Sequence, residues 1–204
     1  RTSSKTQSAL LEVMEEGHVT VDGVTHEVPK PFIVLATQDP LGTAGTQMLP
    51  GSQLDRFMVK LSMGYPDKKS QVELLRDRQT ENPIDKVQQI SDAEALSQMQ
   101  EKAGQVYMAD SMLEYITDLT DATREDPMIT LGVSPRGALA LCRMTKAKAY
   151  LSDRDYAVPE DVQAVFADVC AHRLVMSPKA RLGNTTASEV LKKVLEDTEA
   201  PKVK

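Results

Sequence analysis

The spacing of apolar positions predicts a helix at the start of the chain, followed directly by a β-hairpin. Within residues 6–16 apolar side chains recur at helical intervals, and Gly17 ends the pattern. The apolar positions of this helix are Ala9, Leu10, Val13 and Met14. Residues 18–28 predict a hairpin because Asp22-Gly23 supplies the two positive φ angles of a type I′ turn. An isolated hairpin is marginal in water, so we expect its apolar face to pack against another element: this face consists of Val19, Val21 and Val24.

Two short apolar runs predict strands of a buried parallel sheet. Residues 32–36 form the first, and the polar residues 37–39 follow at the end of the strand where ligands bind in such sheets. Residues 59–63 form the second run. Two strands and a hairpin are too few for a self-sufficient parallel sheet. Since the chain opens at Arg1 without an initiator Met, we expect the missing sheet partners to lie N-terminal to it.

From about residue 67 onward the pattern becomes helical. Asp67 is predicted to cap a helix that runs to about residue 78, and Asn82-Pro83 breaks it. Ser91 to Glu94 is read as a capping box that opens a helix to about residue 105. Further helix starts are predicted at Asp110, Ser134-Pro135 and Pro159, with a last helix over 188–195. Residues 176–186 and 198–204 are predicted to be loose.

Composition and charge narrow the functional classes. Lys and Arg number 24 against 30 Asp and Glu, a net charge of −6, which disfavours nucleic acid as a partner. The apolar runs are far shorter than the ~18 residues of a membrane span, so we expect no membrane insertion. The two cysteines, Cys142 and Cys170, lie in helical patterns and are expected to be buried and unpaired, which fits a cytoplasmic location. The three histidines form no metal set.

Several segments, taken together, resemble the MoxR family of AAA+ ATPases, in order and spacing, from Arg1 to about Leu174. They are Lys5 to Glu12, Val19 to Gly23, Ala36 to Pro40, Leu54 to Phe57, Leu131 to Arg136 and Pro159 to Val162. The resemblance implies the C-terminal half of an AAA+ P-loop core, with a parallel sheet and an inserted β-hairpin, plus a helical lid domain. It divides the chain into residues 1–66 (core), 67–90 (connecting helix and linker) and 91–204 (lid). The phosphate-binding loop G-x-x-x-x-G-K-[ST] and an acidic magnesium-binding strand do not occur in the 204 residues.

The resemblance also assigns two arginines. Arg56 matches the arginine finger, which reaches the γ-phosphate bound by the neighbouring subunit and offsets the charge that develops on the transferring phosphoryl group. The competing interpretation of Arg56 is a surface side chain near Asp55 that steadies a turn. Arg136 matches the sensor-2 position, on the first turn of a lid helix facing the nucleotide of its own subunit. The competing interpretation of Arg136 is an ordinary exposed helix side chain.

Asp39 occupies the sensor-1 position, where the family usually has Asn. An amide can donate a hydrogen bond to phosphate, whereas an ionised Asp only accepts, and it is repelled by a γ-phosphate unless a cation intervenes. Either Asp39 positions the attacking water, or hydrolysis is weak in this member. A third alternative gives the role to Thr37 or Gln38.

The function that the resemblance implies belongs to a parent protein. That protein would bind ATP and Mg²⁺ and hydrolyse ATP in a ring, expected to be a hexamer, to drive chaperone-like remodelling or assembly of client proteins. A von Willebrand A-domain protein is an expected partner. This chain alone is expected to bind no nucleotide tightly and to be inactive. The alternative is a non-catalytic helical protein-interaction module, and an upstream phosphate-binding loop would distinguish the two.

Overall fold

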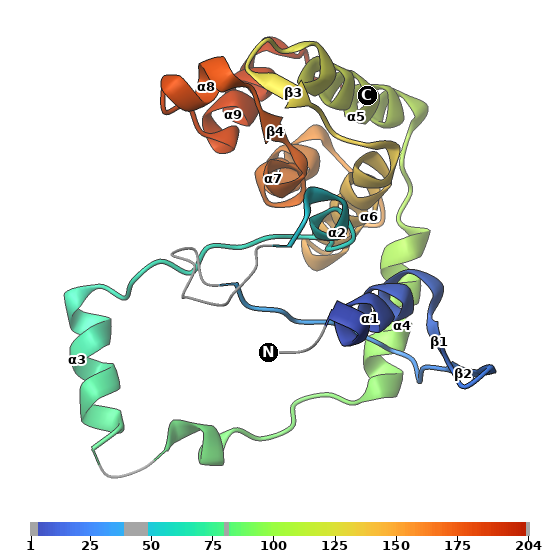
Figure 1. Ribbon diagram of the computed structural model, residues 1–204, viewed down its shortest axis with the longest axis vertical. Coiled ribbons are helices and arrows are strands. Elements are labelled where there is room, and N and C mark those ends of the chain that lie inside the picture. The colour runs from blue at the N-terminus through green and yellow to red at the C-terminus, as the bar shows by residue number, and fades with distance from the viewer. Residues whose placement is uncertain (1–3, 39–48, 80–81, 203–204) are drawn as a thin grey trace.

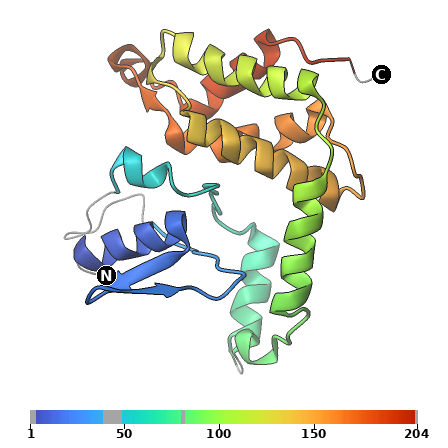
Figure 2. The same ribbon diagram turned by 90° about the vertical axis from the view of Figure 1, so that its right-hand side faces the viewer.

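The computed structural model describes residues 4–38, 49–79 and 82–202 of the chain (Figure 1). A bundle of helices from the C-terminal half lies at one end of the molecule, and the first helix and the hairpin lie below it (Figure 2). Among the described residues there is no helix whose length and apolar character would let it span a lipid bilayer.

The N-terminal helix and the hairpin form as predicted. Helix α1 (Ser4–Glu16) is ended by Gly17 at φ +71°, a left-handed conformation that suits glycine. Strands β1 (His18–Val21) and β2 (Val24–Glu27) pair antiparallel, and Asp22 and Gly23 both have positive φ angles, as a type I′ turn requires. Over residues 9–16 of α1 the buried side chains are Leu11 and Val13, whereas Leu10 is exposed. In the hairpin, β1 contacts α1 and Val19 is partly buried, whereas Val21 and Val24 are about half exposed, so the expected packing of this face is met only in part within the described residues.

The predicted buried strands are the main correction. Residues 32–36 and 59–63 lie outside any strand, and Leu35 and Met63 are 93% and 97% exposed. A central strand needs ladder partners on both edges, and no strand within the described residues pairs with these runs. The two sheets within the described residues are antiparallel pairs, β1 with β2, and β3 (Ile129–Leu131) with β4 (Val175–Met176).

The middle of the chain is loosely connected to the rest. Helix α2 (Gly51–Leu54) is a single turn, and α3 (Lys68–Asp77) stands apart from the other helices in Figure 1. As predicted, Asp67 caps α3, because its carboxylate accepts the backbone N–H of Ser70 at 2.7 Å. The 3₁₀ turn η1 (Pro83–Lys86) follows the predicted break at Asn82-Pro83.

The C-terminal helices agree with the sequence pattern, with three corrections. They are α4 (Ala93–Gln105), α5 (Asp110–Glu125), α6 (Pro135–Leu151), α7 (Pro159–Cys170), α8 (Pro178–Leu182) and α9 (Ala187–Asp197). The cap of α4 is Asp92 and not Ser91, and Asp110 is the first residue of α5 and not its cap. The stretch 176–186, predicted to be loose, contains part of β4 and all of α8. Ser134 caps α6 as predicted.

The hydrophobic core lies between α5, α6, α7 and α9. Its fully buried side chains include Leu119, Leu141, Phe166 and Leu191. Burying each such side chain stabilises the fold by about 1.5–3 kcal/mol. Cys170 belongs to this core, and burial raises the pKa of its thiol to about 12, as expected for a cysteine that only fills space. The short 3₁₀ turn η2 (Ala171–Arg173) extends α7 toward the segment that follows α2.

Candidate functional site

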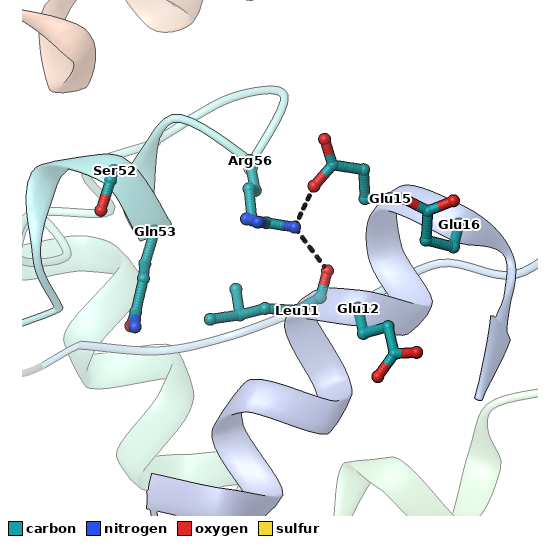
Figure 3. A pocket seen from close by; sticks show the side chains of 7 residues that line it. All are labelled: Leu11, Glu12, Glu15, Glu16, Ser52, Gln53 and Arg56. Carbon is teal, nitrogen blue, oxygen red and sulfur yellow. Dashed lines mark hydrogen bonds and ion pairs between the residues drawn. The ribbon is translucent and has the colours of Figure 1, made fainter. Parts of the chain in front are cut away.

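Arg56 lies just after α2 and extends toward the C-terminal end of α1 (Figure 3). Its Nη1 donates to the backbone carbonyl of Leu11 at 3.0 Å and forms an ion pair with Oε2 of Glu15. Both charged side chains are about one-third exposed, so the pair is accessible from solvent. Arg56 is therefore held against α1 by an acidic partner on the molecular surface.

Arg136, in the first turn of α6, binds the same glutamate. Its Nη2 pairs with Oε1 of Glu15, and its Nη1 lies 3.6 Å from Oδ2 of Asp55. The cap at Ser134 accepts the N–H of Gly137 at 3.1 Å, which fixes the start of this helix as the sequence predicted. The two oxygens of Glu15 are thus divided between two arginines that are 80 positions apart in the sequence.

Asp55 has different partners from Arg56. Its carboxylate lies 3.0 Å from Nε of Arg173 and accepts a hydrogen bond from the hydroxyl of Ser134 at 3.1 Å. The competing interpretation of Arg56, a surface side chain near Asp55 that steadies a turn, stays a prediction beside the arginine finger; the observed partners of Arg56 are Glu15 and the carbonyl of Leu11. Asp55 connects the start of α6 to η2.

Arg173 is the residue of this site that sequence analysis missed. Its side chain is only 2% exposed, and burial lowers the pKa of its guanidinium, although an arginine remains charged in any protein. The residue before it, His172, has its Nε2 3.0 Å from the carbonyl oxygen of Phe57, and burial also lowers the pKa of this imidazole. The signal in the sequence was a pair of polar residues, His172 and Arg173, inside an otherwise apolar run.

A cavity of about 360 Å³ adjoins Arg56 between α1 and α2 (Figure 3). It is lined by Leu11, Glu12, Glu15, Glu16, Ser52, Gln53 and Arg56. Three carboxylates against one guanidinium make this cavity unfavourable for a phosphate group, because like charges at close range repel. An anion would instead approach the exposed side of the arginine pair and compete with Glu15.

The third predicted site residue, Asp39, lies outside the described residues. Its neighbours Thr37 and Gln38 are exposed and belong to no helix or strand. No group of three or more His, Cys, Asp or Glu that could hold a metal ion occurs within residues 4–38, 49–79 and 82–202.

Comparison with known proteins identifies the class. Residues 1–59 match the family described as "ATPase family associated with various cellular activities (AAA)", and residues 121–194 match the AAA lid domain. The structure also superimposes on the crystal structure of a candidate ATPase from Cytophaga hutchinsonii, with a TM-score of 0.90 and 34% sequence identity over 99% of this chain and 64% of that one. Together with the helical bundle described above, these matches define an AAA-type ATPase core joined to its lid.

Sequence relatives narrow the class to one family. The chain is 34% identical to Chaperone MoxR1 of Mycobacterium tuberculosis, over 100% of this chain and 56% of that protein. It is 40% identical to the uncharacterized protein YeaC of Bacillus subtilis, over 98% of this chain and 63% of the relative. The chain belongs to the MoxR family of AAA+ ATPases. It spans less than two thirds of the length of each of these relatives.

Proposed function

We propose that this chain contributes Arg56 and Arg136 to an ATP-hydrolysing site in a ring of AAA+ subunits. The observation that supports the proposal is the binding of both guanidinium groups to the two oxygens of one carboxylate, that of Glu15. Carboxylates and phosphoryl groups offer arginine a similar set of anionic oxygens, and arginine pairs well with both. In this proposal a terminal phosphate approaches from the exposed side of the two arginines and replaces Glu15 as their acceptor.

The two arginines would have different roles at that phosphate. Arg56 is the arginine finger that acts on ATP bound by the neighbouring subunit, and Arg136 is the sensor-2 arginine. Because both share one acceptor, we propose that Arg136 acts on the same phosphoryl group as Arg56, that of the ATP bound by the neighbouring subunit, and not on the nucleotide of its own subunit as the resemblance implies. Their positive charge would offset the negative charge that develops during transfer, an effect worth about 10³–10⁵ in kcat for an arginine finger.

The remaining parts of the site complete the proposal. The 204 residues contain no G-x-x-x-x-G-K-[ST] loop, so ATP and Mg²⁺ would be held mainly by residues outside this chain. When bound, Mg²⁺ would neutralise charge on the β- and γ-phosphates. We assign Asp39 to the sensor-1 position, as an acceptor that orients the attacking water. This chain alone is accordingly proposed to be inactive.

The same proposal covers organisation and partners. Residues 1–66 would belong to the nucleotide-binding core, 67–90 would form the connection, and 91–204 would form the lid. The parent would be a cytoplasmic ring, a hexamer, that remodels or assembles client proteins, with a von Willebrand A-domain protein as one partner. Membership of the MoxR family and the similarity to a relative named as a chaperone support the chaperone-like part of this proposal.

The test uses single substitutions in the full-length protein. Arg56→Ala should lower kcat for ATP hydrolysis by about 10³-fold or more. Arg143→Ala is the matched control, because Arg143 lies on the same helix as Arg136 with an exposed side chain, and it should leave kcat unchanged.

A mixing experiment then tests action between subunits. Arg56→Ala subunits are combined with subunits whose phosphate-binding lysine, outside this chain, is replaced. If Arg56 acts on the neighbour's ATP, mixed assemblies recover activity that neither variant has alone. An unchanged rate in Arg56→Ala, or mixtures that recover nothing, would contradict the proposal.

A further inference from the structure

The segment that carries Arg56 is fastened to the lid by one buried side chain, Arg173. Its Nη2 donates to the carbonyl oxygens of Asp55 and Phe57, at 3.1 and 2.7 Å. Its Nη1 donates to the carbonyl of Met58 at 3.2 Å and to the carbonyl of Val169, one turn earlier in α7. A single guanidinium thus joins three backbone carbonyls around Arg56 to the C-terminal end of a lid helix.

The carboxylate of Asp55 extends this connection to the start of α6. It lies 3.0 Å from Nε of Arg173, accepts from the hydroxyl of Ser134, and lies 3.6 Å from Nη1 of Arg136. The residue before one proposed catalytic arginine is therefore bound to the cap of the helix that presents the other. Any displacement of this segment relative to α6 would break these contacts.

Two further features hold the segment in the same place. The backbone N–H of Lys60 donates to the carbonyl of Asp168 in α7 at 3.0 Å. Gly137 leaves the space through which the Arg173 side chain passes, since a Cβ at this position would lie 2.8 Å from Cδ of Arg173. The segment 55–60 thus binds to α6, α7 and η2 of the lid.

We propose that Arg173 is a positioning residue, which joins the Arg56 segment to the lid so that Arg56 and Arg136 move as one body. The proposal rests on the function proposed above for these two arginines. Arginine suits this role because its planar fork reaches several acceptors in fixed directions, whereas lysine offers a single nitrogen. Rotation of the lid would therefore carry both arginines toward or away from the phosphate together.

The first experiment measures backbone hydrogen exchange in the full-length protein. Arg173→Gln and Arg173→Lys should each raise the exchange rate of a peptide covering 54–60 by about tenfold or more, while peptides of α5 keep their protection. The lysine variant matters because it retains the positive charge but carries all its donors on a single nitrogen. If lysine restores full protection of 54–60, the geometric role of Arg173 is refuted.

The matched control is Arg154→Gln. Arg154 is another lid arginine bound to an aspartate, Asp161, and its pair lies away from the Arg56 segment. Its loss should lower the thermal midpoint of the lid and leave exchange in 54–60 unchanged. If Arg154→Gln loosens 54–60 as much as Arg173→Gln does, the effect reflects lid stability in general and the proposal fails.

The second experiment measures ATP hydrolysis. A displacement of about 1 Å in a catalytic group can lower the rate by about 100-fold. Arg173→Lys should therefore lower kcat by about this factor with KM for ATP changed less than about threefold, because ATP is held elsewhere. Arg154→Gln should retain the wild-type kcat at a temperature where it is folded.

The two experiments separate the two proposals. If exchange in 54–60 increases while kcat stays unchanged, Arg173 holds the segment to the lid, but the proposed effect of this contact on catalysis is refuted. If the wild-type protein hydrolyses no ATP, the function proposed for Arg56 fails, and hydrogen exchange still decides whether Arg173 holds the segment. Unchanged exchange in both Arg173 variants would refute the inference whatever the ATPase rate.

Discussion

Replacing Asp161 by Asn should destabilise the lid by about 3 kcal/mol at neutral pH. The carboxylate of Asp161 is almost fully buried and accepts two hydrogen bonds from Arg154, at 2.5 and 2.7 Å. It also accepts the N–H of Val158 at 2.9 Å, which closes the start of α7. Asparagine has the same shape but only one oxygen and no charge, so it cannot replace both interactions.

The magnitude follows from the burial of the two partners. Removing one member of a buried ion pair costs about 3–5 kcal/mol, because the other charge is left without compensation. The Arg154 side chain is 24% exposed, so water can solvate part of the abandoned guanidinium, and we take the lower end of that range. The control is Asp168→Asn, an exposed residue of the same helix, which should change stability by less than about 0.5 kcal/mol.

The pH dependence gives a second check on the same pair. Burial alone would raise the pKa of Asp161, but the hydrogen bonds from Arg154 and Val158 outweigh it and lower the pKa below its usual value. A lowered folded-state pKa contributes stability above the unfolded value of about 3.9, and this contribution is lost as the pH falls through the folded value. The difference in free energy of unfolding between wild type and Asp161→Asn should therefore become smaller as the pH is lowered from about 5 toward 2.

The assay is urea unfolding followed by far-UV circular dichroism, repeated across this pH range. Arg154→Gln and the double variant complete a mutant cycle, in which the coupling energy should account for most of the loss. An Asp161→Asn variant within about 1 kcal/mol of wild type at pH 7 would refute this reasoning. So would a gap that stays constant at low pH, since the charge of Asp161 would then have no part in it.

Three further predictions concern residues near the site and in the core. Gly137→Ala should destabilise the protein by about 1–3 kcal/mol in urea unfolding, because the new Cβ would lie 2.8 Å from Cδ of Arg173. Burial lowers the pKa of His172, so the folded state resists protonation of this side chain. The free energy of unfolding should therefore decrease as the pH is lowered past about 6.5, by at most about 1.4 kcal/mol per pH unit. Unfolding across this pH range should show that loss in wild type and not in His172→Gln. Cys170 should stay unreactive toward a thiol reagent in the native protein and react in urea, whereas the partly exposed Cys142 should react first in mass-spectrometric mapping.

The helices could be predicted from the sequence because their starts are local signals. Asp67, Ser134 and Pro159 each mark a helix within a few residues, and no distant contact is needed to interpret them. The capping errors were small for the same reason: Ser91 and Asp92 are both good caps, and only the backbone geometry decides between them.

The strands could not be predicted in the same way. An apolar run such as residues 32–36 reports a tendency to be buried, but a strand also requires a partner for each edge. The described residues offer none, so Ile33 and Leu35 remain exposed in a segment that belongs to no helix or strand. The hairpin could be predicted because the Asp22-Gly23 turn brings its two strands together without contacts from elsewhere in the chain.

The candidate site was predictable only in part. Arg56 and Arg136 follow from motifs that resemble a family, but their common partner Glu15 does not. Arg173 escaped prediction because its acceptors around Arg56 lie more than 110 positions away in the sequence. A buried arginine shows its role only when the fold shows what its donors reach.

The strengths of these contacts indicate where the site would open first. The pairs of Glu15 with Arg56 and Arg136 are partly exposed, and such pairs are worth about 0–1 kcal/mol each and weaken with salt. The contacts of Arg173 are buried, and breaking them would leave a charge without partners. A force that separates the lid from α1 would therefore release the two arginines from Glu15 while Arg56 stays fixed to the lid. An anion that offers more oxygens and more charge than Glu15 would then meet two guanidinium groups whose backbone segments are joined to each other through Arg173 and Asp55.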